Sequence, residues 1–228
     1  MSLPVPFAME IITFFIDLLL HLDRHLVMLL EQYGMWLYAI LFLIIFCETG
    51  LVVTPFLPGD SLLFMAGALA AGGGGLDPAI LIAVLFTAAV LGDTLNYTIG
   101  KHFGTRMERW RDSRFFNRRA LERTQAFYAR HGGKTIVIAR YMPIIRTFAP
   151  FVAGMARMEY RRFAMFNVLG AALWVAPLIM LGYWFGNLPV VKNNLSAVVI
   201  GIVILSLMPI VIAWWKERGA YRDAGAGT

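Results

Sequence analysis

Charged residues are scarce in this sequence. Asp, Glu, Lys and Arg make up 15% of its 228 residues, whereas 59% of the residues are hydrophobic. A typical soluble domain carries about 25% charged residues. The mean hydropathy of +0.69 points the same way. The composition therefore excludes an ordinary soluble globular protein and predicts an integral, all-α membrane protein.

Other familiar features are also absent. The single cysteine, Cys47, rules out a disulfide within the chain. The N-terminus has no basic segment followed by a short apolar core and a small-residue cleavage site, so we expect no removed signal peptide. No Ser/Gly-rich linker divides the chain, which predicts a single membrane domain over residues 1–228.

Long apolar runs are what the sequence does have. A spanning helix needs roughly 20 mostly apolar residues, and four segments meet this requirement: 35–54, 79–100, 163–186 and 195–215. Two further apolar segments do not. Segment 59–71 is too short to cross, and segment 135–156 is interrupted by two prolines and two arginines.

The distribution of basic residues decides how these two segments are treated. Ten of the twenty Lys and Arg residues lie in segment 101–134, which the positive-inside rule places in the cytoplasm. If segment 135–156 crossed the membrane, Arg157, Arg161 and Arg162 would lie outside. A re-entrant hairpin keeps them inside. By the same reasoning segment 59–71 is a second re-entrant hairpin, entering from the opposite face, and both termini are cytoplasmic.

Two pairs of similar sequence motifs indicate an internal repeat. Phe64–Gly67 (FMAG) recurs as Phe151–Gly154 (FVAG), and Ile99–Gly104 (IGKHFG) resembles Leu181–Gly186 (LGYWFG). Four spans with two hairpins from opposite faces predict an inverted-topology repeat, as transporters show. The alternative is that these small residues recur for helix packing alone.

Two segments are predicted to lie along the membrane surface. Segment 9–33 mixes apolar and charged residues, which indicates an amphipathic interfacial helix. Its His21 and His25 share a helix face, but no third ligand accompanies them, so we expect no metal. Segment 101–134 combines arginines with aromatic residues and suits anionic headgroups. We expect no nucleic-acid binding and no cofactor.

Four charged residues fall at membrane depth: Glu48, Asp60, Arg140 and Arg146. Each costs about 2.5–3.5 kcal/mol at the bilayer centre, so they should face one another or water. Nearby prolines and glycines free backbone groups that only a lined cavity can satisfy; the candidate cavity residues are Pro58, Gly59, Pro143 and Pro150. Asp93 and Asn96, one helical turn apart, suit the same cavity or interfacial anchoring equally well.

These residue types suggest roles. Arg140 and Arg146 match phosphate oxygens and would hold an anionic substrate. Glu48 and Asp60, partly removed from water, would bind and release protons. The pattern predicts a proton-coupled anion carrier. A static set of salt bridges that holds the hairpins in place is the alternative.

The sequence also resembles a known family. FCETGLVVTPFLPGDSLLFMAGALA, GDTLNYTIGKHFG, HGGKTIVIARYMPIIRTFAPFVAGM and YRRFAMFNVLGAALWV closely resemble the bacterial DedA family, whose membrane domain is also called the VTT or SNARE-associated domain. The likeness extends from about residue 9 to about residue 215. It implies an inner-membrane protein with two facing re-entrant hairpins, and places the family's essential acidic pair on Glu48 and Asp60 and its essential arginines on Arg140 and Arg146.

The resemblance also implies a substrate class. Family members support envelope integrity, and some are implicated in returning undecaprenyl phosphate across the membrane. The leading expectation is thus a lipid-phosphate transporter whose partners are membrane lipids and protons; formation of a homo-oligomer is left open. Rival expectations are a proton-dependent antiporter of small cations or cationic drugs and a non-transporting scaffold. A lipid phosphatase is not expected, because no histidine lies in a predicted span.

Overall fold

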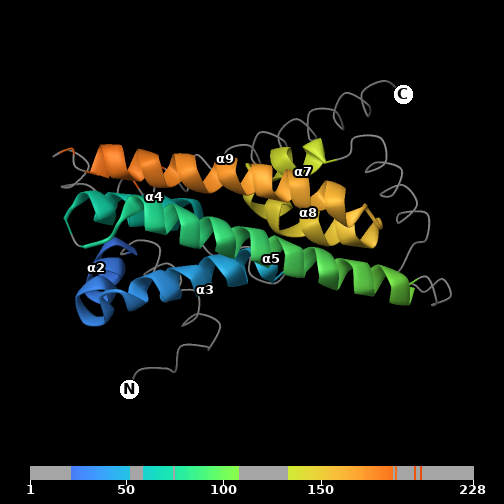
Figure 1. Ribbon diagram of the computed structural model, residues 1–228, viewed down its shortest axis with the longest axis horizontal. Helices are drawn as coiled ribbons and strands as arrows, with labels where there is room; N and C mark the ends of the chain where they lie inside the picture. The colour runs from blue at the N-terminus through green and yellow to red at the C-terminus, as the bar shows by residue number, and fades with distance from the viewer. Residues whose placement is uncertain are drawn as a thin grey trace, which may run out of the picture. The chain divides into compact units, whose positions relative to one another are not determined.

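The computed structural model describes residues 22–51, 59–73, 75–107 and 133–186, with residues 188, 198 and 201 (Figure 1). Within these ranges the regular structure is helical and contains no strand, so the predicted all-α class is confirmed. The helices are α2 (Leu22–Tyr33), α3 (Trp36–Gly50), α4 (Gly59–Ala71), α5 (Pro78–Met107), α7 (Lys134–Ala139), α8 (Pro143–Met155) and α9 (Tyr160–Gly186).

Three helical runs are long and apolar enough to cross a membrane: Leu26–Gly50, Pro78–Gly104 and Tyr160–Gly186. They cover the predicted spans 79–100 and 163–186 and residues 35–50 of the predicted span 35–54, whose residues 52–54 lie outside the described residues. The first also takes in part of the segment predicted to lie at the interface, with a break at Gly34, whose φ of 50° is left-handed. The predicted span 195–215, residues 9–21 and most of segment 101–134 lie outside the described residues.

Helix α5 is longer than the sequence indicated. It continues past the predicted end at residue 100 to Met107. His102, which the prediction left outside the span, therefore lies on this helix. At its other end Asp77 caps the helix, because its Oδ1 accepts the backbone N–H groups of Ala79 at 2.7 Å and Ile80 at 3.2 Å.

The two predicted hairpins correspond to short or broken helices. The 13 residues of α4 span about 20 Å at 1.5 Å per residue, less than the roughly 30 Å hydrocarbon core. Segment 135–156 contains α7 and α8, which contact each other and are separated by a break at Arg140–Met142. Pro143 starts α8, where its missing N–H costs no hydrogen bond. The re-entrant course of both segments stays a prediction.

The chain divides into two compact units. The first contains α2, α4, the start of α3 and of α5, and the second half of α9; its ranges are Met1–Phe42, Pro58–Leu85 and Val175–Val203. The second contains the end of α3, most of α5, all of α7 and α8, and the first half of α9; its ranges are Leu43–Leu57, Phe86–Trp174 and Ile204–Thr228.

In the first unit, α4 packs against α9 through glycines. A Cβ atom on Gly182 would overlap the backbone carbonyl of Phe64, and one on Gly67 would overlap the carbonyl of Ile179. Further along α9, Gly186 lies directly over Ala68. The missing side chains let the two backbones touch, so the helices approach closely.

In the second unit, α8 packs against α5 in the same way. A Cβ atom on Gly100 would overlap the carbonyl of Phe151, one on Gly154 would overlap the carbonyl of Tyr97, and Gly104 lies over Met155. The similar sequence motifs thus form the same kind of helix contact once in each unit: Phe64–Gly67 meets Leu181–Gly186 in the first unit, and Phe151–Gly154 meets Ile99–Gly104 in the second. The inverted orientation of the repeats stays a prediction.

An aromatic core supports this contact in the second unit. Tyr97, Ile136, Ala153 and Phe163 are buried together. The rings of Tyr97 and Phe163 are stacked with centroids 4.4 Å apart, and the Tyr97 hydroxyl donates a hydrogen bond to the carbonyl of Met158. The core therefore ties α5 to α7, α8 and the start of α9, which positions the residues described next.

Candidate functional site

Four oppositely charged side chains are buried within the second unit. Glu48 comes from the end of α3, Asp93 from the middle of α5, and Arg140 and Arg146 from the break and first turns of the α7–α8 pair. Their exposed fractions are 1%, 2%, 3% and 5%. Burial of this many charges is costly unless each is paired.

The charges are paired one to one. Arg146 Nη2 forms a salt bridge with Glu48 Oε1, and Arg140 Nη2 lies 2.8 Å from Asp93 Oδ2. Two carboxylates face two guanidinium groups, so the formal charge of this ion-pair cluster is zero. The pairing supplies much of the solvation that the groups lose on leaving water.

One tryptophan connects the two ion pairs. The indole ring of Trp174, in α9, has the Cζ atom of Arg146 at 4.3 Å and that of Arg140 at 5.4 Å from its centroid. A cation over an aromatic face is attracted by the ring quadrupole, more strongly when both are desolvated. Trp174 is 3% exposed. The ring therefore offers both guanidinium groups a shared surface and limits where they can move.

Two asparagines fix the surrounding backbone. Arg140 Nη1 donates to the side chain of Asn167 at 3.2 Å, and Asn167 Nδ2 in turn donates to the carbonyl of Val90 at 3.1 Å. Asn96 Nδ2 donates to the carbonyls of Thr49 at 3.0 Å and Thr147 at 2.7 Å. Asn96 thereby links α3, α5 and α8 at the level of the ion pairs.

Some buried polar atoms of the cluster lack a hydrogen-bond partner among the described residues. They are Asp93 Oδ1, Asn96 Oδ1 and Arg140 Nε. Buried polar groups are normally satisfied, and each exception calls for an explanation. One donor and two acceptors at one place give the cluster capacity to bind a further polar group.

The cluster contains three of the four charged residues predicted from the sequence: Glu48, Arg140 and Arg146. Asp60 belongs to the first unit, where it lies in the first turn of α4, a favourable place for a negative charge. Its predicted proton-coupling role stays a prediction.

Of the other candidates, Asp93 and Asn96 are buried, and Asp93 pairs with Arg140; their lining of a cavity stays a prediction. Gly59 and Pro150 are buried, Pro143 starts α8, and Pro58 lies outside the described residues.

The sequence interpretation missed Asn167 and Trp174. Asn167 had a usable signal, because it is an uncharged polar residue inside an apolar run. Trp174 lies seven positions further on and therefore on the same helix face, but a tryptophan in a span usually serves packing or interfacial anchoring. Only the folded contacts identify it as the common neighbour of two arginines.

The role of Asn96 can be tested by stability. Asn96→Leu would leave the carbonyls of Thr49 and Thr147 without this donor, so we expect a loss of about 2 kcal/mol in the free energy of unfolding. Thr94→Val is the matched control, since its hydroxyl donates to the carbonyl of Val90 in its own helix, and should cost less than about 1 kcal/mol. Denaturant unfolding in detergent measures both; equal losses would contradict the linking role.

Comparison with known proteins relates this geometry to a family. The family model of the VTT domain matches residues 57–184. Protein DedA of Escherichia coli is 54% identical over 213 residues, which cover 93% of this chain and 97% of DedA. This chain belongs to the DedA family. The resemblance seen in the sequence motifs is therefore confirmed.

Other DedA-family relatives are membrane proteins by name. The inner membrane proteins YghB and YqjA of E. coli are 35% and 33% identical, over 75% and 80% of this chain and 77% and 86% of their own lengths. An uncharacterized membrane protein of Mycobacterium leprae is 41% identical over 75% of this chain and 77% of its own length. No solved structure matches. These relatives and the apolar helices establish a bacterial inner-membrane protein.

Proposed function

We propose that this DedA-family protein carries a lipid phosphate across the inner membrane and couples the movement to protons. The observation that carries the proposal is the ion-pair cluster: two arginines, each held by a single carboxylate, lie over one tryptophan in a buried site. Arginine binds phosphate through two parallel hydrogen bonds, which a lysine cannot reproduce. The cluster thus presents two phosphate-binding groups at the same place.

The carboxylates explain how binding would couple to protons. Glu48 and Asp93 occupy the guanidinium groups when they are ionised, and a phosphate must displace them. Protonation of a carboxylate weakens its hold on the arginine and frees that arginine for phosphate. A phosphate monoester dianion that arrives with two protons keeps the buried cluster formally neutral, and neutrality avoids the cost of an uncompensated buried charge. Asp60 is a further proposed proton carrier.

Undecaprenyl phosphate is the substrate that fits this proposal best. Its single phosphate suits the arginine pair, and its long apolar tail can stay in the lipid beside the apolar helices. The family resemblance supports the same choice. An antiporter of cations is the second candidate function, but in the cluster both carboxylates already face an arginine, which opposes a cationic substrate.

Leaflet exchange tests the proposal. The full chain is reconstituted in liposomes that contain undecaprenyl phosphate, and exchange is followed with and without a pH gradient. We expect the gradient to accelerate exchange. Arg140→Lys should slow it at least tenfold, because lysine loses the fork geometry, and the exposed Lys134→Ala serves as control.

Each rival predicts a different result. An absence of lipid exchange, together with proton efflux triggered by added cations, would support the antiporter. If Arg140→Lys and Glu48→Gln both retained wild-type exchange, the cluster would be only a structural support. If neither lipid nor cation moved and both variants still complemented a strain that lacks the protein, a scaffold would explain the family role.

A further inference from the structure

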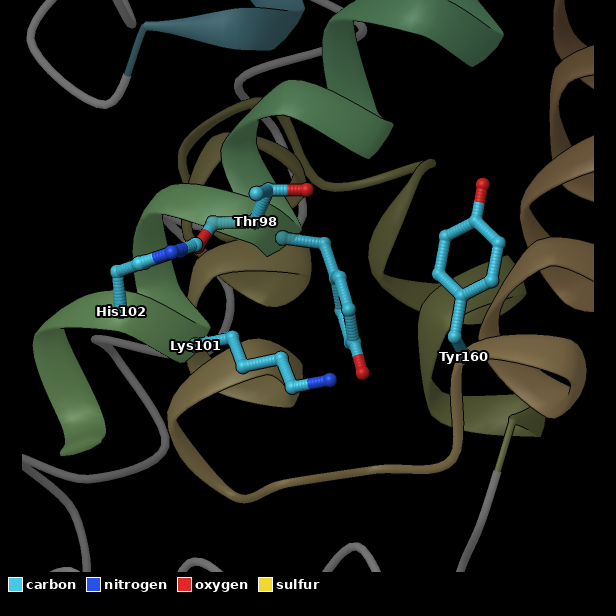
Figure 2. A pocket seen from close by; sticks show the side chains of 5 residues that line it. Thr98, Lys101, His102 and Tyr160 are labelled. Atoms are coloured by element: carbon cyan, nitrogen blue, oxygen red, sulfur yellow. The ribbon is translucent and has the colours of Figure 1, made fainter.

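A second polar site lies in the second unit, between α5 and the first turn of α9. Five side chains from these two helices line a cavity of about 400 Å³ (Figure 2): Tyr97, Thr98, Lys101, His102 and Tyr160. Small-molecule sites typically measure about 300–1,000 Å³. None of these residues belongs to the ion-pair cluster, and the proposed function gives none of them a role.

One wall of the cavity is aromatic and held in place. Tyr97 is 2% exposed, stacks on Phe163 and bonds to the carbonyl of Met158. The ring of Tyr160 lies 5.8 Å from that of Tyr97 between centroids, tilted by 53°, and is about half exposed. This wall is therefore anchored in the core on one side and reaches solvent or headgroups on the other.

The other wall is polar and positively charged. Thr98, Lys101 and His102 are exposed and share one face of α5, since residues three and four apart lie side by side. Figure 2 shows the ammonium group of Lys101 pointing across the cavity toward the side of Tyr160. His102 Nδ1 lies 2.9 Å from the carbonyl oxygen of Thr98. Because a carbonyl oxygen can only accept a hydrogen bond, Nδ1 carries a proton in this contact.

The charge balance selects the ligand. The described residues that line the cavity include Lys101 but no carboxylate. Next to Tyr160 in the chain, the exposed Arg161 and Arg162 outweigh the exposed Glu159 by one positive charge, and the whole chain carries +6. A positive field of this kind raises the local concentration of anions. A quaternary ammonium group, which two tyrosines alone could attract, would be repelled by Lys101.

We propose that this cavity binds a phosphorylated headgroup, with the phosphate on Lys101 and the remainder of the headgroup against Tyr97 and Tyr160. The Thr98 hydroxyl donates its only hydrogen to the carbonyl of Thr94 at 2.7 Å, so it lines the cavity without donating to the phosphate. Charge-assisted hydrogen bonds from an ammonium group suit phosphate oxygens. The cavity exceeds the size of a phosphate alone, and the tyrosine faces accommodate the additional atoms. A lipid headgroup and a free phosphate share this chemistry, and the experiment separates them.

The site is close to the ion-pair cluster along the chain, because Tyr97 directly follows Asn96 on α5. By the positive-inside rule this end of α5 faces the cytoplasm. A headgroup bound here would lie at the membrane surface and not at membrane depth. The inference does not require transport, and it goes beyond the proposed function by adding a separate surface site.

Calorimetric titration of the purified full chain in detergent tests the site. The probes are dihexanoyl phosphatidic acid, inorganic phosphate and, as the uncharged analogue, dihexanoylglycerol. We expect Lys101→Ala to weaken binding of phosphatidic acid about tenfold and Lys101→Glu to weaken it further. Lys134→Ala is the matched control, since Lys134 is exposed in the same unit but does not line the cavity, and it should leave the affinity unchanged.

The outcomes are distinct. Lys101-dependent binding of phosphatidic acid but not of inorganic phosphate identifies a lipid-headgroup site, and equal Lys101-dependent binding of both identifies a phosphate site. The proposal is overturned if Lys101→Ala and Lys134→Ala weaken binding equally, if dihexanoylglycerol binds as well as phosphatidic acid, or if neither phosphate probe binds. If lipid exchange fails in liposomes while Lys101-dependent binding persists, only the proposed function is wrong.

Discussion

Arg146→Ala is expected to destabilise the protein by about 3–5 kcal/mol, because it leaves Glu48 buried without its counter-charge. The same change removes one of the two guanidinium groups over Trp174 and should abolish lipid exchange. Denaturant unfolding in detergent and the liposome assay measure the two effects separately.

The companion variants show whether the loss comes from the ion pair. The double variant Glu48→Gln with Arg146→Gln removes both charges, so it should be more stable than Arg146→Ala alone while still failing to exchange lipid. Lys134→Ala removes an exposed positive charge and should change stability by less than about 0.5 kcal/mol. A loss for Arg146→Ala as small as that of the control would mean that Glu48 and Arg146 are not paired in the folded protein.

Gly100→Ala is expected to cost about 3 kcal/mol, because the added Cβ atom would overlap the carbonyl of Phe151 and force α5 and α8 apart. In a helix with free space at that position, Gly→Ala raises the free energy of unfolding by about 1 kcal/mol. A loss of stability therefore indicates that α5 and α8 touch at Gly100. Separation of these helices would also break the hydrogen bond from Asn96 of α5 to the carbonyl of Thr147, the neighbour of Arg146 in α8. We therefore expect reduced lipid exchange together with reduced stability.

Because the helix contact is repeated, Gly100→Ala can be compared with the equivalent substitution in the first unit. Gly182→Ala should cost a similar amount, because Gly182 meets Phe64 in the first unit as Gly100 meets Phe151 in the second. Gly72→Ala is the control, since its Cβ atom would meet the nearest carbonyl oxygen at 3.4 Å, near ordinary contact. Thermal unfolding of the purified variants measures the three effects. If all three variants behaved alike, the repeated helix contact would not stabilise either unit.

Part of the site could be predicted from sequence alone. Glu48, Arg140 and Arg146 were identified because a charge inside an apolar run is too costly to leave in lipid, and the structure places all three in one cluster. Asp93 remained ambiguous, since a span ending at residue 100 puts it near the membrane surface. In the structure α5 continues to Met107, which places Asp93 near the middle of the helix.

The partners of these residues could not be predicted. Apolar periodicity shows that a helix forms but not which helix it contacts, so nothing in the sequence indicated that Trp174 meets both arginines. The same limit applies to the glycine motifs. Their recurrence was visible in the sequence, whereas the pairing of α4 with α9 and of α8 with α5 depends on contacts between residues far apart in the chain.

In the proposed transport cycle, phosphate displaces the carboxylates of the ion-pair cluster, and these carboxylates take up protons when it does. The most direct test measures proton uptake as a water-soluble short-chain lipid phosphate binds to the purified protein in weakly buffered detergent solution. We expect the wild type to take up protons on binding, and Glu48→Gln and Asp93→Asn each to lower the number of protons taken up. Binding without proton uptake, or uptake unchanged in both variants, would contradict it.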